Sequence, residues 1–219
     1  MVGNPDSPSK EERERHELTH ANHRSWCKHC QRALAMRDKH NTKANKKGEH
    51  RYNESGMAMV PETESAENGF TKFSMDYMVM NSEDGDKAKS TMVMVNHEDG
   101  GIFTYATPSK GIQDEAYWVP KRMAKDIDNC GNQKAIVQIQ SDQEPAIVNV
   151  QEEIRSLRKG RTICTNSPVG ESESNGRAEN AFKRVQVKFR ALRADLEEKF
   201  GCKINVNKPF GTWLTRCAG

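Results

Sequence analysis

The segment FTKFSMDYMVM, residues 70–80, has the pattern of a β-strand with an acid in its middle. Phe73 and Met75 alternate with Ser74 and Asp76, which is the two-residue period of a strand. An aspartate inside a hydrophobic strand is costly to bury without a partner. The acid therefore predicts a partner that offsets its desolvation, and a metal ion is the obvious one.

The segments that follow alternate between strand and helix patterns, as in an α/β domain. The hairpin signals EDGD and DG join the first strand to two more strands. The predicted order is three strands, a helix, a strand, a helix, a strand and a long helix. The predicted strands are 70–80, 90–98, 101–109, 134–142 and 161–167, and the predicted helices are 112–131, 144–159 and 175–200.

Composition excludes some classes of protein. The chain has 219 residues and a formal charge of +3, which is too small to imply a polyanionic partner by itself. The first fifteen residues hold no apolar leader, and no run approaches the roughly 18 apolar residues that a membrane span needs. We expect a soluble, unsecreted protein without a membrane partner. The six cysteines are scattered except for one pair, which favours reduced thiols over a disulfide scaffold.

Two further acids follow elements of the predicted fold. Asp142 stands where the strand AIVQIQSD ends, the edge at which open α/β sheets place ligand groups. Glu179 follows 37 positions later, on the long helix. Taken alone, Asp142 could cap the next helix, and Glu179 could be a solvated helix residue. Together with Asp76 they match a site for two divalent cations about 3.5–4 Å apart, Mg²⁺ or Mn²⁺, which would promote phosphoryl transfer.

Cationic and amide side chains accompany the third acid. At 100° per residue, Lys183, Gln186 and Arg190 form one row with Glu179 along the helix, a pattern suited to tracking phosphates. The preceding loop is rich in Gly, Ser and Asn and is suited to closing on a DNA end, although an ordinary surface connection has the same composition. The basic stretch 28–51 would track phosphates or serve as a solvated linker. The candidate DNA-contacting residues are Asn175, Lys183, Gln186, Arg190, Lys46 and Lys47.

A cluster of histidines and cysteines precedes the domain. His16 and His20 are four residues apart and so share a helix face, and Cys27 and Cys30 form a C-x2-C knuckle. Four ligands suited to tetrahedral Zn²⁺ therefore lie within fifteen residues. Metal would supply much of the folding energy of so short a segment. The alternative ligands are His23 and His29.

Three blocks, FSMDYM, IQSDQEPAI and SPVGESESNGRAENAFKRVQ, resemble those of the retroviral-type integrase core, the RNase H-like domain of retroviruses and long-terminal-repeat retrotransposon polyproteins. The resemblance implies a mixed five-stranded sheet flanked by helices, with Asp76, Asp142 and Glu179 as metal ligands. It also implies that Lys183 and Gln186 face the element's own DNA end. The preceding segment resembles the His-His-Cys-Cys domain of integrases, but only six residues separate the second histidine from the first cysteine, so we expect a minimal zinc turn.

Composition and the resemblance together divide the chain into four parts. We expect a disordered polar segment at 1–15, a zinc-binding segment with a basic extension at 16–51, a linker at 52–69, and a catalytic core at 70–219 that is truncated at its C-terminus.

The resemblance further implies DNA integration, by 3′-end processing and strand transfer on element ends and target DNA. A homo-oligomer would act in the nucleus, with a cytoplasmic particle before entry as the other location. Two alternatives remain open. The ending PFGTWLTRCAG and the Pro120 inside a predicted helix favour a degenerate nucleic-acid-binding fragment. A related RNase H-like nuclease would instead cut an RNA–DNA hybrid.

Overall fold

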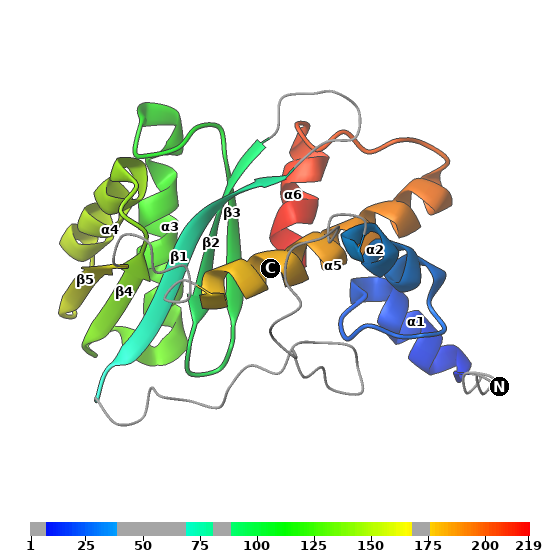
Figure 1. Cartoon of the computed structure of the whole chain (residues 1–219), viewed down its shortest axis with the longest axis horizontal. Helices are drawn as coiled ribbons and strands as arrows, with labels where there is room; N and C mark the ends of the chain where they lie inside the picture. Colours follow the sequence, from blue (N-terminus) through cyan, green and yellow to red (C-terminus); the bar gives the residue numbers. More distant parts are fainter. Residues whose placement is uncertain (1–7, 39–68, 81–88, 168–175) are drawn as a thin grey trace. The chain divides into compact units, whose positions relative to one another are not determined.

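The computed structural model describes residues 8–38, 69–80, 89–167 and 176–219, which form two compact units (Figure 1). One unit holds a β-sheet, the helices on its two faces and the start of the long helix α5 (Gly176–Phe200). The other holds two short N-terminal helices together with residues 184–204. The candidate catalytic acids belong to the first unit, and the candidate zinc ligands belong to the second.

The sheet has five strands in the order β3-β2-β1-β4-β5. β1 pairs antiparallel with β2 and parallel with β4, so the sheet is mixed. The mixed five-stranded sheet with flanking helices that the sequence predicted is confirmed. The strands are β1 (Thr71–Met80), β2 (Lys89–Asn96), β3 (Ile102–Thr107), β4 (Val137–Ser141) and β5 (Thr162–Asn166).

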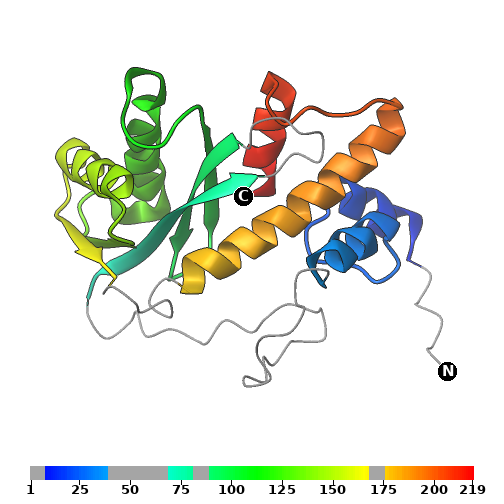
Figure 2. The same ribbon diagram turned by 45° about the horizontal axis from the view of Figure 1, so that its top comes forward.

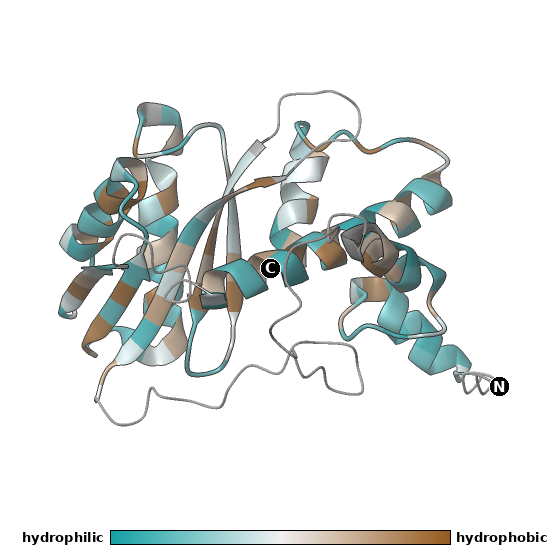
Figure 3. Ribbon diagram, viewed as in Figure 1, coloured by the Kyte–Doolittle hydropathy of each residue, from teal (hydrophilic) through white to brown (hydrophobic). Residues whose placement is uncertain are grey.

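Both faces of the sheet are covered. On one face, Phe73 and Met75 of β1 are fully buried in a core that α3 (Trp118–Ile127) and α4 (Pro145–Leu157) complete. On the other face lies α6 (Pro209–Ala218), where the Thr104 hydroxyl donates a 2.9 Å hydrogen bond to the Thr215 carbonyl (Figure 2). Apolar residues recur along the strands, whereas α1 is mostly hydrophilic (Figure 3). This double coverage explains why Ser74 and Met78, which belong to the second side-chain set of β1, are buried as well.

The helix predicted over 112–131 is divided in the structure. A 3-10 turn spans Asp114–Ala116, α3 begins at Trp118, and a π-helical turn spans Asp128–Asn132. Pro120 therefore lies in the first turn of α3, where backbone N–H groups have no helical partner and proline is tolerated. This placement removes one reason for treating the chain as degenerate.

Three helices lie outside the predicted order of elements. The ending PFGTWLTRCAG forms α6, which the predicted element order lacks. The prediction of disorder through residue 15 is wrong from Lys10, where α1 (Lys10–Thr19) begins. The Ser9 hydroxyl caps it by accepting a 3.1 Å hydrogen bond from the Glu12 N–H, and acids fill its first turn. A third helix, α2 (Lys28–Asp38), follows the cysteine knuckle.

A buried arginine at the end of α4 gives a stability prediction. The Arg158 side chain is fully buried and bonds to the Asp128 carboxylate at 3.1 Å, the Thr162 hydroxyl at 2.7 Å and a backbone carbonyl. Arg158→Met should lower the free energy of unfolding by about 3 kcal/mol, because it leaves these acceptors unpaired. Urea denaturation measures the change. Arg155→Met removes an exposed arginine one turn earlier, and an equal loss from that variant would contradict the prediction.

Candidate active site and zinc centre

The strand register brings two of the predicted acids together. β1 and β4 run parallel, and Ser74 lies opposite Gln140 in their last paired position. Asp76 stands two residues after Ser74, and Asp142 stands two residues after Gln140, so both lie at the same edge of the sheet and on the same face. Neighbouring strands are about 4.8 Å apart. The two carboxylates therefore come from adjacent strands, at the level where β4 ends and β1 continues beside β2.

The third predicted acid lies close enough to act on the first. Burial raises the pKa of Asp76 to about 6, with further contributions from the charges of Asp142, Glu144 and Glu179. Glu179 itself is exposed, in the first turn of α5. Among the described residues, these acids do not form a group whose oxygens already lie within metal-ligand distance of one another. A divalent cation bound between them would offset the repulsion of their charges.

Asp142 also binds the backbone at the start of the next helix, which was the alternative role that the sequence left open. Its Oδ1 accepts a 3.1 Å hydrogen bond from the Glu144 N–H at the start of α4. The capping interpretation and the metal-ligand interpretation are compatible, since the hydrogen bond uses one carboxylate oxygen and leaves the other available.

Glu144 is a residue that sequence reasoning missed. Its charge reaches Asp76, and both its oxygens accept hydrogen bonds from the Lys110 ammonium, at 2.7 and 2.8 Å. Lys110 follows β3 and lies over the ring of Tyr77, 5.3 Å from its centroid. The lysine partly neutralises the negative charge of this fourth acid. Only its position two residues after Asp142 could have signalled this neighbour.

Two successive polar contacts link the start of α5 to the sheet. Arg177 donates a hydrogen bond to the His97 carbonyl at 3.3 Å, and the His97 Nε2 lies 2.7 Å from the Ser74 hydroxyl. Burial, with the charges of Arg177 and Lys72, lowers the pKa of His97 to about 4, so this ring is neutral at neutral pH. The contacts fix the helix turn that carries Glu179 next to the strand that carries Asp76.

The raised pKa of Asp76, caused first by burial and then by the neighbouring acids, gives a testable pH dependence. Its pKa is higher in the folded protein than the usual 3.8, so folding takes up protons, and stability falls as pH rises from about 4 to 6. Asp76→Asn should remove this loss and stabilise the magnesium-free protein at pH 7.5 by about 1–2 kcal/mol, after allowance for solvent screening. Urea denaturation of the variant and the wild-type protein at pH 7.5, without chelator so that zinc is retained, measures the gain. Glu115→Gln changes an exposed acid and is the control. An equal gain in stability in that variant would contradict the burial of Asp76 as the cause.

The predicted DNA-contacting residues are only partly described. Lys183 is exposed on α5, and Gln186 and Arg190 are partly exposed on the same helix. Their row remains a prediction, because no contact of theirs tests it. Asn175, Lys46 and Lys47 lie outside the described residues, as does the predicted linker at 52–69.

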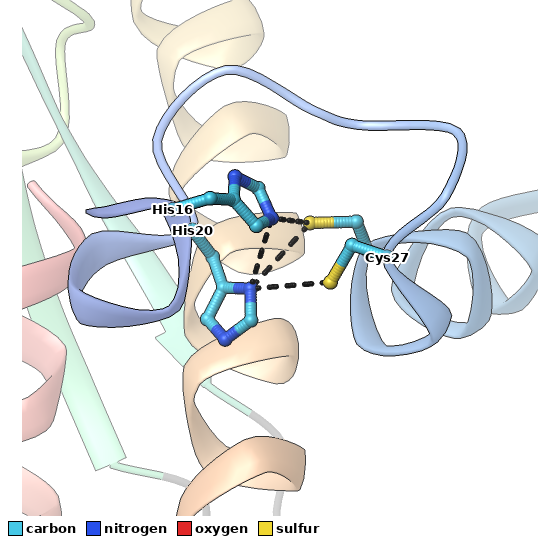
Figure 4. Close-up of side chains that lie close together, drawn as sticks. His16, His20 and Cys27 are labelled. Carbon is cyan, nitrogen blue, oxygen red and sulfur yellow. Dashed lines mark hydrogen bonds between the residues drawn. The ribbon is translucent and has the colours of Figure 1, made fainter. Parts of the chain in front are cut away.

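The predicted zinc ligands converge. His16, His20, Cys27 and Cys30 are all buried, and their ligand atoms lie within 4.8 Å of one another, the only such group in the described part of the chain (Figure 4). The His16 Nε2 and His20 Nδ1 are 3.3 Å apart, and nitrogen-to-sulfur distances are 3.4, 3.5 and 3.7 Å. Tetrahedral zinc with ordinary bond lengths requires edges of about 3.3 Å between nitrogens and about 3.6 Å between nitrogen and sulfur.

The geometry fits the first of the two ligand sets. Burial lowers the pKa of His16 and His20, which favours the neutral rings that bind metal. His23 and His29 are outside the group that the structure brings together. His16 lies in α1 and His20 directly follows it, while Cys27 directly precedes α2 and Cys30 lies in its first turn. The expected minimal zinc turn is instead a pair of helices joined by a short loop.

No family model matches the chain, and no curated protein matches it. Among solved structures, a chain of the simian T-cell lymphotropic virus intasome in complex with the PP2A regulatory subunit B56 gamma matches 67% of this chain at 14% identity with a TM-score of 0.48. The BIV integrase catalytic core domain matches 67% at 15% identity with a TM-score of 0.40, and this chain covers 79% of it. RNase H1 from compost, LC11, matches 51% at 14% identity with a TM-score of 0.31, and 91% of it is covered. The chain spans 46% of the intasome chain.

Proposed function

We propose that the protein is the zinc-binding and catalytic part of an integrase from a long-terminal-repeat retrotransposon polyprotein, and that it cuts and joins DNA by metal-dependent phosphoryl transfer. The observation that carries the proposal is the placement of Asp76 and Asp142 on adjacent parallel strands, with the charge of Glu179 near enough to raise the pKa of Asp76. These are the residues that the integrase-like blocks of the sequence mark as metal ligands. A mixed sheet of the expected topology supports the same assignment.

The acids and the lysine of the candidate site would have different roles in the reaction. Asp76, Asp142 and Glu179 would hold Mg²⁺ or Mn²⁺ through carboxylate oxygens. When bound, the ions would activate the attacking oxygen and neutralise charge that develops on the leaving one. Lys183, exposed one turn beyond Glu179 on α5, would contact a DNA phosphate beside the metals, because an ammonium binds phosphate as a point charge.

The zinc centre would have a structural role. All four of its ligands come from the protein and all are buried, which is typical of closed structural sites and leaves no position for substrate. It would fix α1 against α2 and hold the N-terminal unit folded.

We further propose that element ends and target DNA are the substrates, that a homo-oligomer carries out the joining reaction, and that it acts in the nucleus. No helix among the described residues is both long and apolar enough to cross a membrane. Light scattering with and without a DNA end measures the oligomeric state. Particles of one chain in both conditions would contradict an oligomer.

A branched oligonucleotide that mimics a strand-transfer product tests the chemistry. The purified protein is incubated with it in Mg²⁺ or Mn²⁺, and resealing or cleavage of the branch is followed on a denaturing gel. We expect metal-dependent resealing of the target strand. A folded protein that binds the branch and leaves it unchanged would contradict the proposal and favour the degenerate binding module.

The same carboxylates would also serve an RNase H-like nuclease, which is the second candidate. A labelled RNA–DNA hybrid assayed in parallel separates the two. Cleavage of the RNA strand without any reaction on branched DNA would replace the first proposal with the second.

A further inference from the structure

One ring nitrogen of His20 has no role in the ligand cluster. The His20 Nδ1 lies 3.3 to 3.7 Å from the other ligand atoms, whereas Nε2 points away from the sulfur atoms (Figure 4). This nitrogen is buried and makes no hydrogen bond with any described residue. If Nδ1 binds metal, the neutral ring carries its proton on Nε2, and a buried N–H of that kind requires an acceptor.

The nearest carboxylate to that nitrogen belongs to Asp195 on α5. Its Oδ2 lies 3.6 Å from the His20 Nε2, and its side chain is only 7% exposed. The Lys199 ammonium donates to the same oxygen at 2.8 Å, and the His29 Nε2 lies 3.5 Å from Oδ1. The carboxylate is thus held in place behind His20, within a few tenths of an ångström of hydrogen-bond distance.

The zinc segment and this part of α5 form one packed unit. Cys27, Cys30 and Ala33 share an apolar cluster with Ala191, which precedes Asp195 by one helical turn. The acid is therefore brought to His20 by the packing of α2 on the helix and not by an isolated ion pair.

We propose that Asp195 is a positioning residue for the zinc centre: it accepts the Nε2–H of His20 and so fixes the ring with Nδ1 toward the metal. The inference rests on the zinc centre of the proposed function. A carboxylate behind a metal-binding histidine fixes its tautomer and orientation, and loss of such a partner typically weakens metal binding by about 10- to 100-fold. The polar partner would come from α5, the helix whose first turn carries the candidate metal ligand Glu179, far from the zinc ligands in sequence.

Zinc affinity of the full chain tests the assignment, measured by competition with a chromophoric chelator. Asp195→Leu should raise the dissociation constant by about 100-fold, and Asp195→Asn, which keeps an oxygen acceptor, by about 10-fold. Stoichiometric binding of one zinc by the wild-type protein is required first. If it fails, both the zinc centre and this inference fail, whereas tight binding by wild type and by Asp195→Leu alike would overturn the inference alone.

Two control variants separate this role from a structural one. Glu198→Gln removes an exposed carboxylate from the same helix that lies near His29 and not near His20. This variant should change zinc affinity less than threefold. Lys199→Met removes the partner of Asp195 and should also have a small effect. If Lys199→Met weakens zinc binding as much as Asp195→Leu, the acid serves the ion pair and the inference is wrong.

A measurement on the wild-type protein covers the case in which the leucine variant does not fold. Long-range proton–nitrogen correlation spectra of the labelled zinc form report the tautomer of each histidine. We expect His20 to carry a slowly exchanging proton on Nε2, with the nitrogen signal of Nδ1 shifted by the metal. A proton on Nδ1, or one on Nε2 that exchanges as fast as that of an exposed histidine, would overturn the proposal.

Discussion

Replacement of Glu179 by glutamine should reduce branch resealing by about a thousandfold or more while leaving the protein folded. An amide keeps the size of the side chain but is a much weaker ligand for Mg²⁺, and several kcal/mol of transition-state stabilisation depend on metal that is held in place. Asp142→Asn should have the same effect, because Asp142 would supply a metal-binding oxygen from the end of β4, the strand beside β1. Initial rates on the branched oligonucleotide in Mg²⁺ measure both losses.

The loss must be separated from unfolding and from weaker DNA binding. Circular dichroism and the thermal midpoint should show a variant at least as stable as wild type without magnesium, since removing one of several crowded carboxylates relieves repulsion. DNA affinity without metal should be unchanged or slightly higher. Glu115→Gln, on an exposed acid of the same unit, should retain full activity. A folded Glu179→Gln protein that reseals DNA at the wild-type rate would reject the assigned site.

The strands and the long helix were predictable because their signals are local. The alternation of side chains in β1, and the apolar residues spaced three and four apart in α5, each indicate which face of the element is buried. The observed bounds of the strands and of α5 differ from the predicted ones by three residues or fewer. α6 was not predicted, since its sequence contains Gly211, whose hypothetical Cβ would lie 2.5 Å from the Asn205 carbonyl oxygen. A glycine that close packing requires looks in the sequence like a helix breaker.

The candidate site was predictable to the extent that single residues stand out. Asp76 is an acid in an apolar strand, and Cys27 and Cys30 have a metal-binding spacing. Neighbours that come from distant segments give no such signal. Lys110 beside Glu144 and Asp195 beside His20 depend on which helices and loops pack together. The sequence signals Asp195 only by its position four residues after Ala191, on the same face of α5. Burying a charged carboxylate on that face costs free energy unless it has a partner.

Loss of the zinc centre should unfold α1 and α2 without disturbing the sheet. In the described residues around the ligands, the apolar cluster consists of two cysteines, two small alanines and partly buried neighbours. So small a core cannot offset the backbone entropy of two helices of 10 and 11 residues. Zinc binding supplies about 10–16 kcal/mol of apparent free energy in comparable small domains at neutral pH. Cys30→Ser should therefore abolish zinc uptake and helical structure in this segment.

Amide hydrogen exchange resolves the two units in one experiment. In the Cys30→Ser protein, the amides of α1 and α2 should exchange at rates near those of an unfolded chain, while those of β1 and β4 keep their protection. Cys202→Ser, which removes an exposed cysteine outside the cluster, should match the wild-type protein in zinc content and exchange. Since the ligands must lose protons to bind metal, acidification of the wild type should release zinc and produce the same loss of protection in α1 and α2. Persistent protection of α1 in a protein shown to be free of zinc would mean that packing alone holds the segment, and the metal would then have no structural role.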